Sequence, residues 1–492
     1  MQPRLVAACL AIAVLAVAPR LLFAVFAPAA GGDADVYLRV AENIFAHGCV
    51  SLSDPATGAC VPHWGGNHYP GFPVFIALSY LLFGHSPAAP LLLQVAASVA
   101  AILRLTYAAT RYTGSTVAGA AVGIVAALSP LQVAWPRFVL TETLLLALVT
   151  WLLAELLLSL YHRRLRVLAL AVPLVALAFV RHDGILFAVT VPIVALAVHD
   201  PRTAIARTAA VAALAAAPLL MWAIRGVLLS LSFFPPSVQT LDGSPAPRGY
   251  VEWRRTWETT SYQAARSQYA VNTLNYRGIG IDPVAYRRGD DPNADKARVE
   301  TLLAEMSQAS GQAFPPSTDR AFGELARERR AEDPVQYWVV LPLRRTVHLW
   351  FDPLSSTGWP AEIGSVQLDV MAGDMQQGGV RALVAAALSN PLVALTKAFV
   401  SGYRGLAIVA LALAVMMAAR RSLGAATMVV TLAAAVFLTR SVFFVAMLAV
   451  QSRYLVGAMP FVETAVVLSA WAIVVRARHQ APANAQVAAS RS

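Results

Sequence analysis

The stretch "LVAACLAIAVLAVAPRLLFAVFA", residues 5–27, decides the fold class. It is an apolar run long enough to cross the hydrocarbon core of a bilayer, which takes about 20 residues of helix. Similar runs recur toward both ends of the 492-residue chain. Hydrophobic residues make up 58% of it and charged residues 13%, and the mean hydropathy is +0.60. Charged residues approach about a quarter of ordinary soluble domains. The sequence therefore predicts an all-α polytopic membrane protein.

The first apolar run has an alternative interpretation as a signal peptide. Arg4 precedes it, and "APA" at Ala27–Ala29 is typical of a cleavage site. The run is longer than a signal peptide's apolar region, and many further spans follow it. We therefore expect an uncleaved first helix.

The charges flanking the apolar runs predict the topology. With the N-terminus inside, every inside segment is basic, as the positive-inside rule requires. These segments contain Arg104 and Arg111, His162–Arg166, Arg202 and Arg207, Arg420 and Arg421, and Arg476 and Arg478. The net charge of +11 therefore orients helices and does not indicate a nucleic-acid partner. About ten spans are expected, at 5–27, 88–109, 114–132, 137–160, 166–180, 184–199, 206–231, 390–418, 423–449 and 455–475.

This topology places two large pieces outside. We expect an N-terminal transmembrane core over 1–231 that includes an outer loop at 28–87, a large extracytoplasmic region over 232–389, C-terminal transmembrane helices over 390–476, and a disordered tail over 477–492. Within the large region, "DKARVETLLAEMSQ" and the segment from Thr318 to Trp350 are expected to be helical. The second of these ends in an aromatic and basic segment suited to the membrane interface.

The first outer loop contains Cys49 and Cys60 on either side of a short polar segment. A disulfide between them is expected if the loop faces an oxidising compartment, and two free thiols are the alternative.

The same loop begins with "DADVYLRVAENIFAHG", which contains Asp33 and Asp35. Tyr37, Ala41 and the other apolar residues recur at helical spacing, so we expect an amphipathic helix at the outer membrane surface, ended by Gly48. Asp33 and Asp35 are candidate catalytic acids. The structural alternative is that Asp33 caps the helix and Asp35 interacts with its dipole.

Histidines His63 and His68 follow in this loop and could ligate a metal beside the aspartates. Because they share no helical face, the sequence gives a divalent metal no support, and we assign no metal ligand.

Ionisable residues elsewhere lie at the outer ends of predicted spans. Glu142 is near the outer end of one span, where an acid usually faces a polar cavity or a partner, and Arg137 is the candidate partner. Arg181 and His182 occupy one outer turn, and Arg453 and Tyr454 the last one. Outer arginines oppose the orienting charge bias, so they indicate either a bound phosphate or contact with lipid headgroups. Together these acids and guanidiniums fall on one face of the membrane.

Four segments resemble the GT-C superfamily of membrane glycosyltransferases, in particular protein mannosyltransferases and the lipid A aminoarabinose transferases. They are the D-x-x-x-Y-x-x-x-A pattern of Asp33, Tyr37 and Ala41, "YPGFPVFIALSYLLFG", "ALSPLQVAWPRFVLTETLLL" and "RYLVGAMP". The resemblance covers residues 5–200 and, less fully, the last two spans. The first loop has Asp-Ala-Asp where the mannosyltransferases have Asp-Glu, which leaves open which aspartate is catalytic.

The resemblance implies inverting transfer of a sugar from a polyprenyl-phosphate donor to a glycan, lipid or protein acceptor outside a bacterial inner membrane. Asp33 would be the general base, while Asp35 and Glu142 would orient hydroxyl groups. Arg181 and Arg453 would hold the phosphate, with Tyr37, Arg137, His182 and Tyr454 as further substrate-binding candidates. The donor is already activated, so no cofactor is expected. A transporter or lipid flippase, and a noncatalytic envelope assembly protein, are the competing interpretations; transporters usually place ionisable sites near the midplane.

Overall fold

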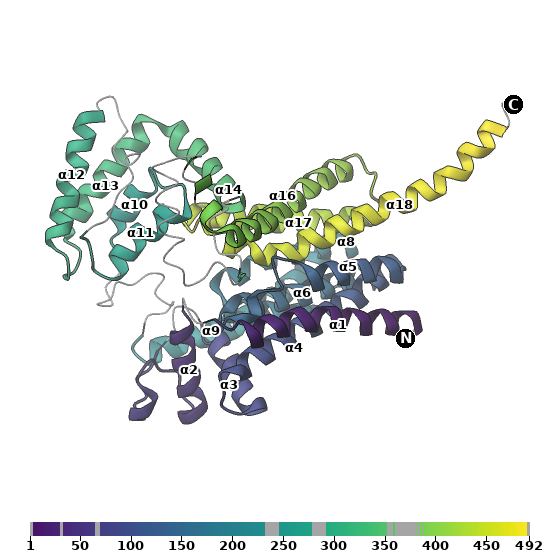
Figure 1. Ribbon diagram of the computed structural model, residues 1–492, viewed down its shortest axis with the longest axis horizontal. Coiled ribbons are helices and arrows are strands. Elements are labelled where there is room, and N and C mark those ends of the chain that lie inside the picture. The colour runs from purple at the N-terminus through teal and green to yellow at the C-terminus, as the bar shows by residue number, and fades with distance from the viewer. Residues whose placement is uncertain are drawn as a thin grey trace.

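The computed structural model describes residues 3–29, 33–63, 69–231, 246–277, 292–351, 358–359, 381, 384–385 and 387–489. Within these ranges the chain is helical and contains no strand, only an isolated bridge between Ala29 and Phe138. The apolar helices form an elongated bundle (Figure 1). The all-α polytopic fold predicted from the sequence is confirmed.

The helices that build the bundle and its two outer pieces have the following bounds. They are α1 (Pro3–Phe26), α2 (Ala34–His47), α3 (Gly71–Phe83), α4 (Ala88–Thr113), α5 (Thr116–Leu128), α6 (Thr141–Tyr161), α7 (Val167–Val180), α8 (Thr190–Val198), α9 (Pro201–Leu228), α10 (Arg248–Arg254), α11 (Ser261–Asn272), α12 (Pro292–Gln308), α13 (Pro316–Glu332), α14 (Leu341–Phe351), α16 (Pro391–Ala419), α17 (Ala426–Ala446) and α18 (Met459–Ala489). Short turns connect them: η1 (Pro55–Thr57), η2 (Trp135–Arg137), η3 (His182–Val189), the π-helical η5 (Gln336–Val340) and η6 (Ser452–Ala458).

Seven helices in the described part of the chain are long and apolar enough to cross a membrane. They are α1, α4, α6, α9, α16, α17 and the segment Arg453–Arg478. The other three expected spans coincide with shorter apolar helices, namely α5, α7 and the combined η3 and α8. At 1.5 Å per residue, the 13 residues of α5 extend only about 20 Å. The helix ends there because Pro130 disfavours helical backbone at the preceding residue, the C-cap Ser129.

Small residues allow close packing between α4 and α5. A Cβ atom on Gly119 of α5 would lie 1.9 Å from Oγ1 of Thr110 on α4, and one on Gly123 would lie 2.2 Å from Oγ1 of Thr106. Close backbone approach of this kind is how membrane helices gain dispersion contacts without a hydrophobic driving force. The most enclosed span is α6, with 83% of its central window buried.

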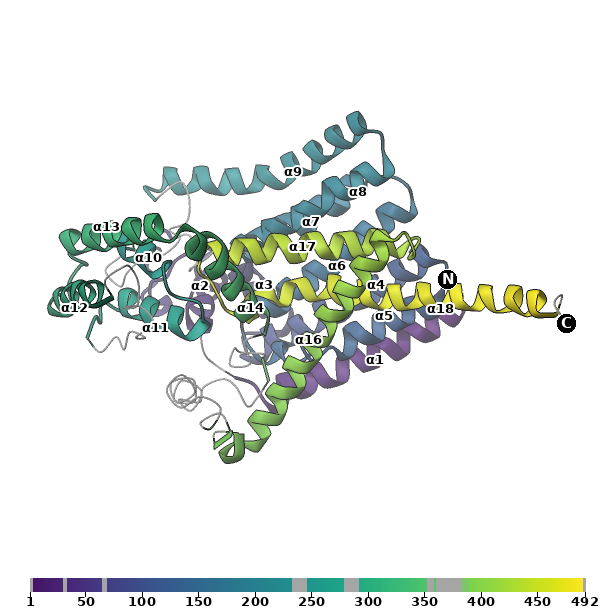
Figure 2. The same ribbon diagram turned by 90° about the horizontal axis from the view of Figure 1, so that it is seen from above.

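The described parts of the two pieces that are expected to be outside lie at one end of the bundle, and both chain termini lie at the other (Figures 1 and 2). Helix α2 projects at the first of these ends, and α10 to α13 form a separate helical unit there. An aromatic core that includes Tyr250, Trp253, Trp257 and Phe322 holds this unit together. The segments expected to be helical in the large loop are α12, α13 and α14.

The tail differs from expectation, because α18 continues to Ala489 through residues expected to be disordered. Alanine, the strongest helix former, is the commonest residue in this part of the sequence, and extending an existing helix avoids the cost of nucleating a new one, even though Pro482 lies within it.

The arrangement predicts the sidedness of two exposed alanines, Ala297 on α12 and Ala477 on α18. In a Cys9→Ser background, a membrane-impermeant maleimide should label Ala297→Cys in intact cells. It should label Ala477→Cys only after the cells are permeabilised. If Ala477→Cys alone were labelled in intact cells, the topology would be the inverse of the one expected.

Candidate active site

Helix α2 presents its two aspartates to different surroundings. Asp33 occupies the N-cap position with φ −85° and ψ 8°, yet its side chain makes no capping hydrogen bond. The alternative interpretation, in which the Asp33 side chain caps the helix, is therefore wrong. Asp35 is exposed and borders a surface hollow of about 470 Å³ together with Arg39, Glu42 and Asp54. Only Asp33 of the pair is partly buried.

Four of the charges predicted to form the site act electrostatically on Tyr37 of α2. Its side chain is 2% exposed, and its ring packs edge-on against Phe72 of α3 at 5.2 Å. Burial raises the pKa of Tyr37; the charges of Asp33 and Glu142 raise it further, and those of Arg181 and Arg453 lower it. Residues from four distant parts of the chain thus lie within electrostatic reach of one phenol.

A chain of buried ion pairs holds two of these charged residues, Arg181 and Glu142, in place. Arg181 donates from Nη1 to Oε1 of Glu142 at 3.3 Å and from Nε to Oδ1 of Asp183 at 2.9 Å. Arg440 of α17 donates to Oδ2 of Asp183 at 2.7 Å. Each of these four side chains is at most 9% exposed. Charges so enclosed are tolerated because each has an opposite partner.

Arg453 is the guanidinium of the cluster that remains partly exposed. It donates from Nε to Oε1 of Gln451 at 2.8 Å and from Nη2 to the Tyr454 hydroxyl at 3.3 Å. Within the described ranges it forms no ion pair. The guanidinium carbons of Arg181 and Arg453 lie 5.0 Å and 5.1 Å from the centre of the Tyr454 ring, so this ring fixes both cations.

The expected pairing of Arg137 with Glu142 is wrong. Arg137 instead donates from Nε to the carbonyl of Ala27 at 2.7 Å, while Ala29 donates to the Arg137 carbonyl at 3.0 Å. Arg137 and Glu142 are five residues apart and belong to different elements, η2 and α6. The partner of Glu142 is instead Arg181, which follows α7. Arg137 thus anchors the chain just before Asp33.

His182, the remaining substrate-binding candidate, follows Arg181 in the sequence. Its ring lies edge-on to that of Tyr69, with the ring centres 5.2 Å apart. The structure therefore places His182 near the start of α3.

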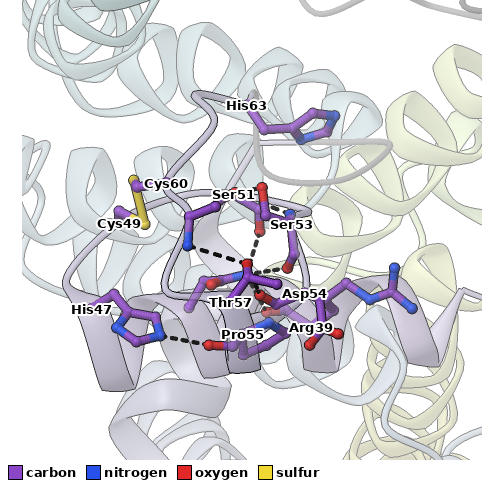
Figure 3. Close-up of a disulfide and its surroundings, with 12 residues drawn as sticks. Arg39, His47, Cys49, Ser51, Ser53, Asp54, Pro55, Thr57, Cys60 and His63 are labelled. Carbon is purple, nitrogen blue, oxygen red and sulfur yellow. Dashed lines mark hydrogen bonds between the residues drawn. A yellow bond between two sulfur atoms is a disulfide. The ribbon is translucent and has the colours of Figure 1, made fainter.

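The structure joins Cys49 and Cys60 in a disulfide, and Figure 3 shows the loop that it closes. Asn43 of α2 donates to the carbonyls of Ser51 and Ser53 at 3.1 Å and 2.9 Å. These bonds fold the loop back on α2, the helix that carries Asp33 and Tyr37.

The candidate metal ligands were the loop histidines His63 and His68. The described residues contain no group of three or more histidines, cysteines and acids that could hold a metal ion. His68 lies outside the described residues. The carbonyl of His63 accepts from Nη1 of Arg225 at 3.1 Å, which connects this loop to α9.

Sequence reasoning missed several buried ionisable residues in the spans, among them Arg20, Arg440 and Glu463. Arg440 pairs with Asp183, as described above. The Arg20 guanidinium donates to the carbonyls of Ala16, Ala126 and Ala127. Glu463 accepts from Ser129 and Gln132 at 2.6 Å each and from Tyr403 at 3.0 Å. Each is an isolated charge within an apolar run, and such a charge is itself a signal of a partner.

Comparison with known families finds a match over part of the chain. Residues 67–222 match the family model described as dolichyl-phosphate-mannose-protein mannosyltransferase. This region includes Glu142, Arg181 and Asp183. The resemblance predicted from the sequence is confirmed for this region. No curated protein matches the sequence.

Two solved structures show a distant likeness. They are ArnT from Cupriavidus metallidurans in the apo state and the same protein bound to undecaprenyl phosphate, each 15% identical to this chain. The TM-scores are 0.39 and 0.38, and the alignments cover 93% and 95% of this chain and 77% of the other chain in both cases. At this level of similarity, nothing about the present chain is inferred from these two structures.

The ion-pair chain predicts that Arg440→Ala destabilises the protein strongly. Removing one partner of a buried pair leaves an uncompensated charge and costs roughly 3–5 kcal/mol. The measurement is the thermal unfolding midpoint in detergent. Lys296→Ala is the control, because its pair with Glu300 is more than half exposed on both sides. Midpoint losses of equal size in the two variants would contradict the expectation.

Proposed function

We propose that this chain is a membrane glycosyltransferase that moves a sugar from a polyprenyl-phosphate donor to an acceptor hydroxyl on the outer face of the bacterial inner membrane. The observation that carries the proposal is the cluster of carboxylates and guanidiniums around Tyr37, at the end of the bundle where the outer pieces lie. The family whose model matches residues 67–222 is named for a polyprenyl-phosphate sugar, dolichyl phosphate mannose.

The general base in this proposal is Asp33. Glu142 is bound to Arg181 and is therefore held as the partner of a cation, and Asp35 is exposed on another side of α2. Asp33 is partly buried near Tyr37 and is not engaged as a helix cap. A carboxylate in such a position can take a proton from an acceptor hydroxyl.

The transfer that follows is a displacement with inversion. The acceptor oxygen loses its proton to Asp33 and forms a bond to the anomeric carbon from the face opposite the leaving group. The bond between the anomeric carbon and the phosphate oxygen breaks, and its electron pair remains on that oxygen. Polyprenyl phosphate leaves with an additional negative charge, which positioned cations stabilise.

The proposal places the donor phosphate beside Arg453. Glu142 and Asp183 are the ion-pair partners of Arg181 and Arg440, whereas Arg453 forms no ion pair within the described ranges. A polyprenyl-phosphate sugar is a phosphodiester with one negative charge. Because Arg181 is bound by two carboxylates, we propose that it orients Glu142 and Tyr454 while Arg453 contacts the phosphate. The large outer region over 232–389 would shape the acceptor site.

The two aspartates of α2 provide a matched test of the base. Asp33→Asn should lower sugar transfer by about 10²- to 10⁴-fold, the range of general base catalysis. Asp35→Asn, two residues away and exposed, should transfer at close to the wild-type rate. The assay supplies membranes with radiolabelled polyprenyl-phosphate sugars at matched protein levels. Equal loss in both variants would remove Asp33 as the base, and no transfer by the wild type with any donor would favour a transporter.

The role of Arg453 can be separated from that of the base by kinetics. Arg453→Gln should raise the KM for the polyprenyl-phosphate donor about tenfold or more, because a hydrogen bond to a charged group contributes roughly 1.5–3 kcal/mol. The KM for the acceptor should change little. Arg39→Gln is the control, since Arg39 is an exposed residue of α2. A raised acceptor KM with an unchanged donor KM would assign Arg453 to the acceptor instead.

A further inference from the structure

A second cavity lies at the other end of the bundle, far from the candidate active site. Its volume is about 380 Å³, within the range of about 300–1,000 Å³ that is typical of small-molecule pockets. The end of α4, the connection between α16 and α17, and the middle of α18 enclose it. The basic segments flanking these helices assign this end to the cytoplasm by the positive-inside rule.

The deeper wall of the cavity is apolar. Leu423 and Leu468 line it and are 2% and 1% exposed, and Ala426 and Val475 also contribute. The hydroxyl of Tyr112 donates to the carbonyl of Ala425 at 2.6 Å, which holds α4 to the α16–α17 connection. A wall of this kind accepts a hydrocarbon chain and offers little to a polar ligand.

The mouth of the cavity is basic. Arg476 lines it and donates to the carbonyl of Ser422 at 3.4 Å. Arg420 and Arg421 directly precede the lining residue Ser422, Arg478 lies two residues beyond Arg476, and all four arginines are exposed. The sequence over 105–120, 410–430 and 464–492, from which the lining residues come, contains no aspartate or glutamate.

Aromatic residues mark the level at which the cavity meets the bilayer. Trp471 lines it in a half-buried position, and Tyr112 lines it from α4. Amphipathic aromatic rings of this kind are enriched at the headgroup level of membranes. An apolar wall beneath a basic mouth at this level has the chemistry of an anionic phospholipid, and basic pockets between membrane helices on the cytoplasmic side bind such headgroups.

We propose that this cavity binds one anionic phospholipid of the inner leaflet. An acyl chain would lie against Leu423 and Leu468, and the phosphate would contact Arg476 together with Arg420 or Arg421. The lipid would then connect α4 of the N-terminal core to α18 and the α16–α17 connection. This site is independent of the proposed transferase activity.

The test measures the thermal unfolding midpoint of the full-length protein in detergent as phospholipid is added. Phosphatidylglycerol should raise the midpoint, and phosphatidylethanolamine should not. A ligand that binds only the folded state stabilises it by mass action, so the concentration giving half of the rise reports affinity. In Arg476→Ala this concentration should increase about fivefold, because one arginine near a membrane surface contributes about that factor.

Two matched controls separate the site from general electrostatics and from misfolding. Arg202→Ala removes an exposed arginine at the start of α9, outside the cavity lining, and should leave the phosphatidylglycerol effect unchanged. Ala472→Phe fills the cavity without altering charge and should abolish the effect, whereas Ala477→Phe, exposed on the same helix, should not. The lipid-dependent change in each variant is compared with that variant's own midpoint without lipid.

Three outcomes would overturn the proposal. The first is an equal rise with phosphatidylethanolamine, and the second is a phosphatidylglycerol effect that survives in both Arg476→Ala and Ala472→Phe. The third is an equal rise with inorganic phosphate, which would replace the lipid by a free anion.

Discussion

The ion pairs of Arg181 with Glu142 and Asp183 are the interaction on which the outer end of the bundle depends. A guanidinium that is 6% exposed among apolar helices is stable only where carboxylates compensate it. The two acids come from α6 and η3, and Arg440 of α17 completes the chain of charges at Asp183. Because each charge needs its partner in place, these three elements can pack in few relative positions.

The same network determines where η6, the turn before α18, lies. Besides Asp183, the Arg440 guanidinium donates to the carbonyl of Tyr454 in η6. The Tyr454 ring stacks on Phe444 with the ring centres 5.2 Å apart, and it also contacts the guanidiniums of Arg181 and Arg453. One buried arginine from α17 thus holds the turn that presents Arg453 to the candidate phosphate position.

The sequence predicts which charged residues lie at the same end of the bundle. Runs of about 20 apolar residues must cross the bilayer as helices, and charge bias orients them, so the common face of Asp33, Glu142, Arg181 and Arg453 could be inferred. Pairing could not be inferred, because the partner of Glu142 is 39 residues away and comes from another helix. The short α5 was also obscured, since hydropathy averages over the turn at Pro130.

The outer unit also has a physical connection to the site, through α14. Arg345 donates from Nε to the carbonyl of Glu258 at 2.8 Å and so binds the unit to this helix. One turn farther on, Trp350 donates to Ser441 of α17 at 2.8 Å and stacks on Phe437 at 4.1 Å. Ser441 is the neighbour of Arg440, whose guanidinium binds Asp183 and the turn bearing Tyr454. Buried ion pairs and stacked aromatic rings resist gradual deformation. A shift of the unit formed by α10 to α13 would therefore be transmitted through α14 to Arg440 of α17, which holds the turn that contains Arg453, the candidate phosphate-binding residue.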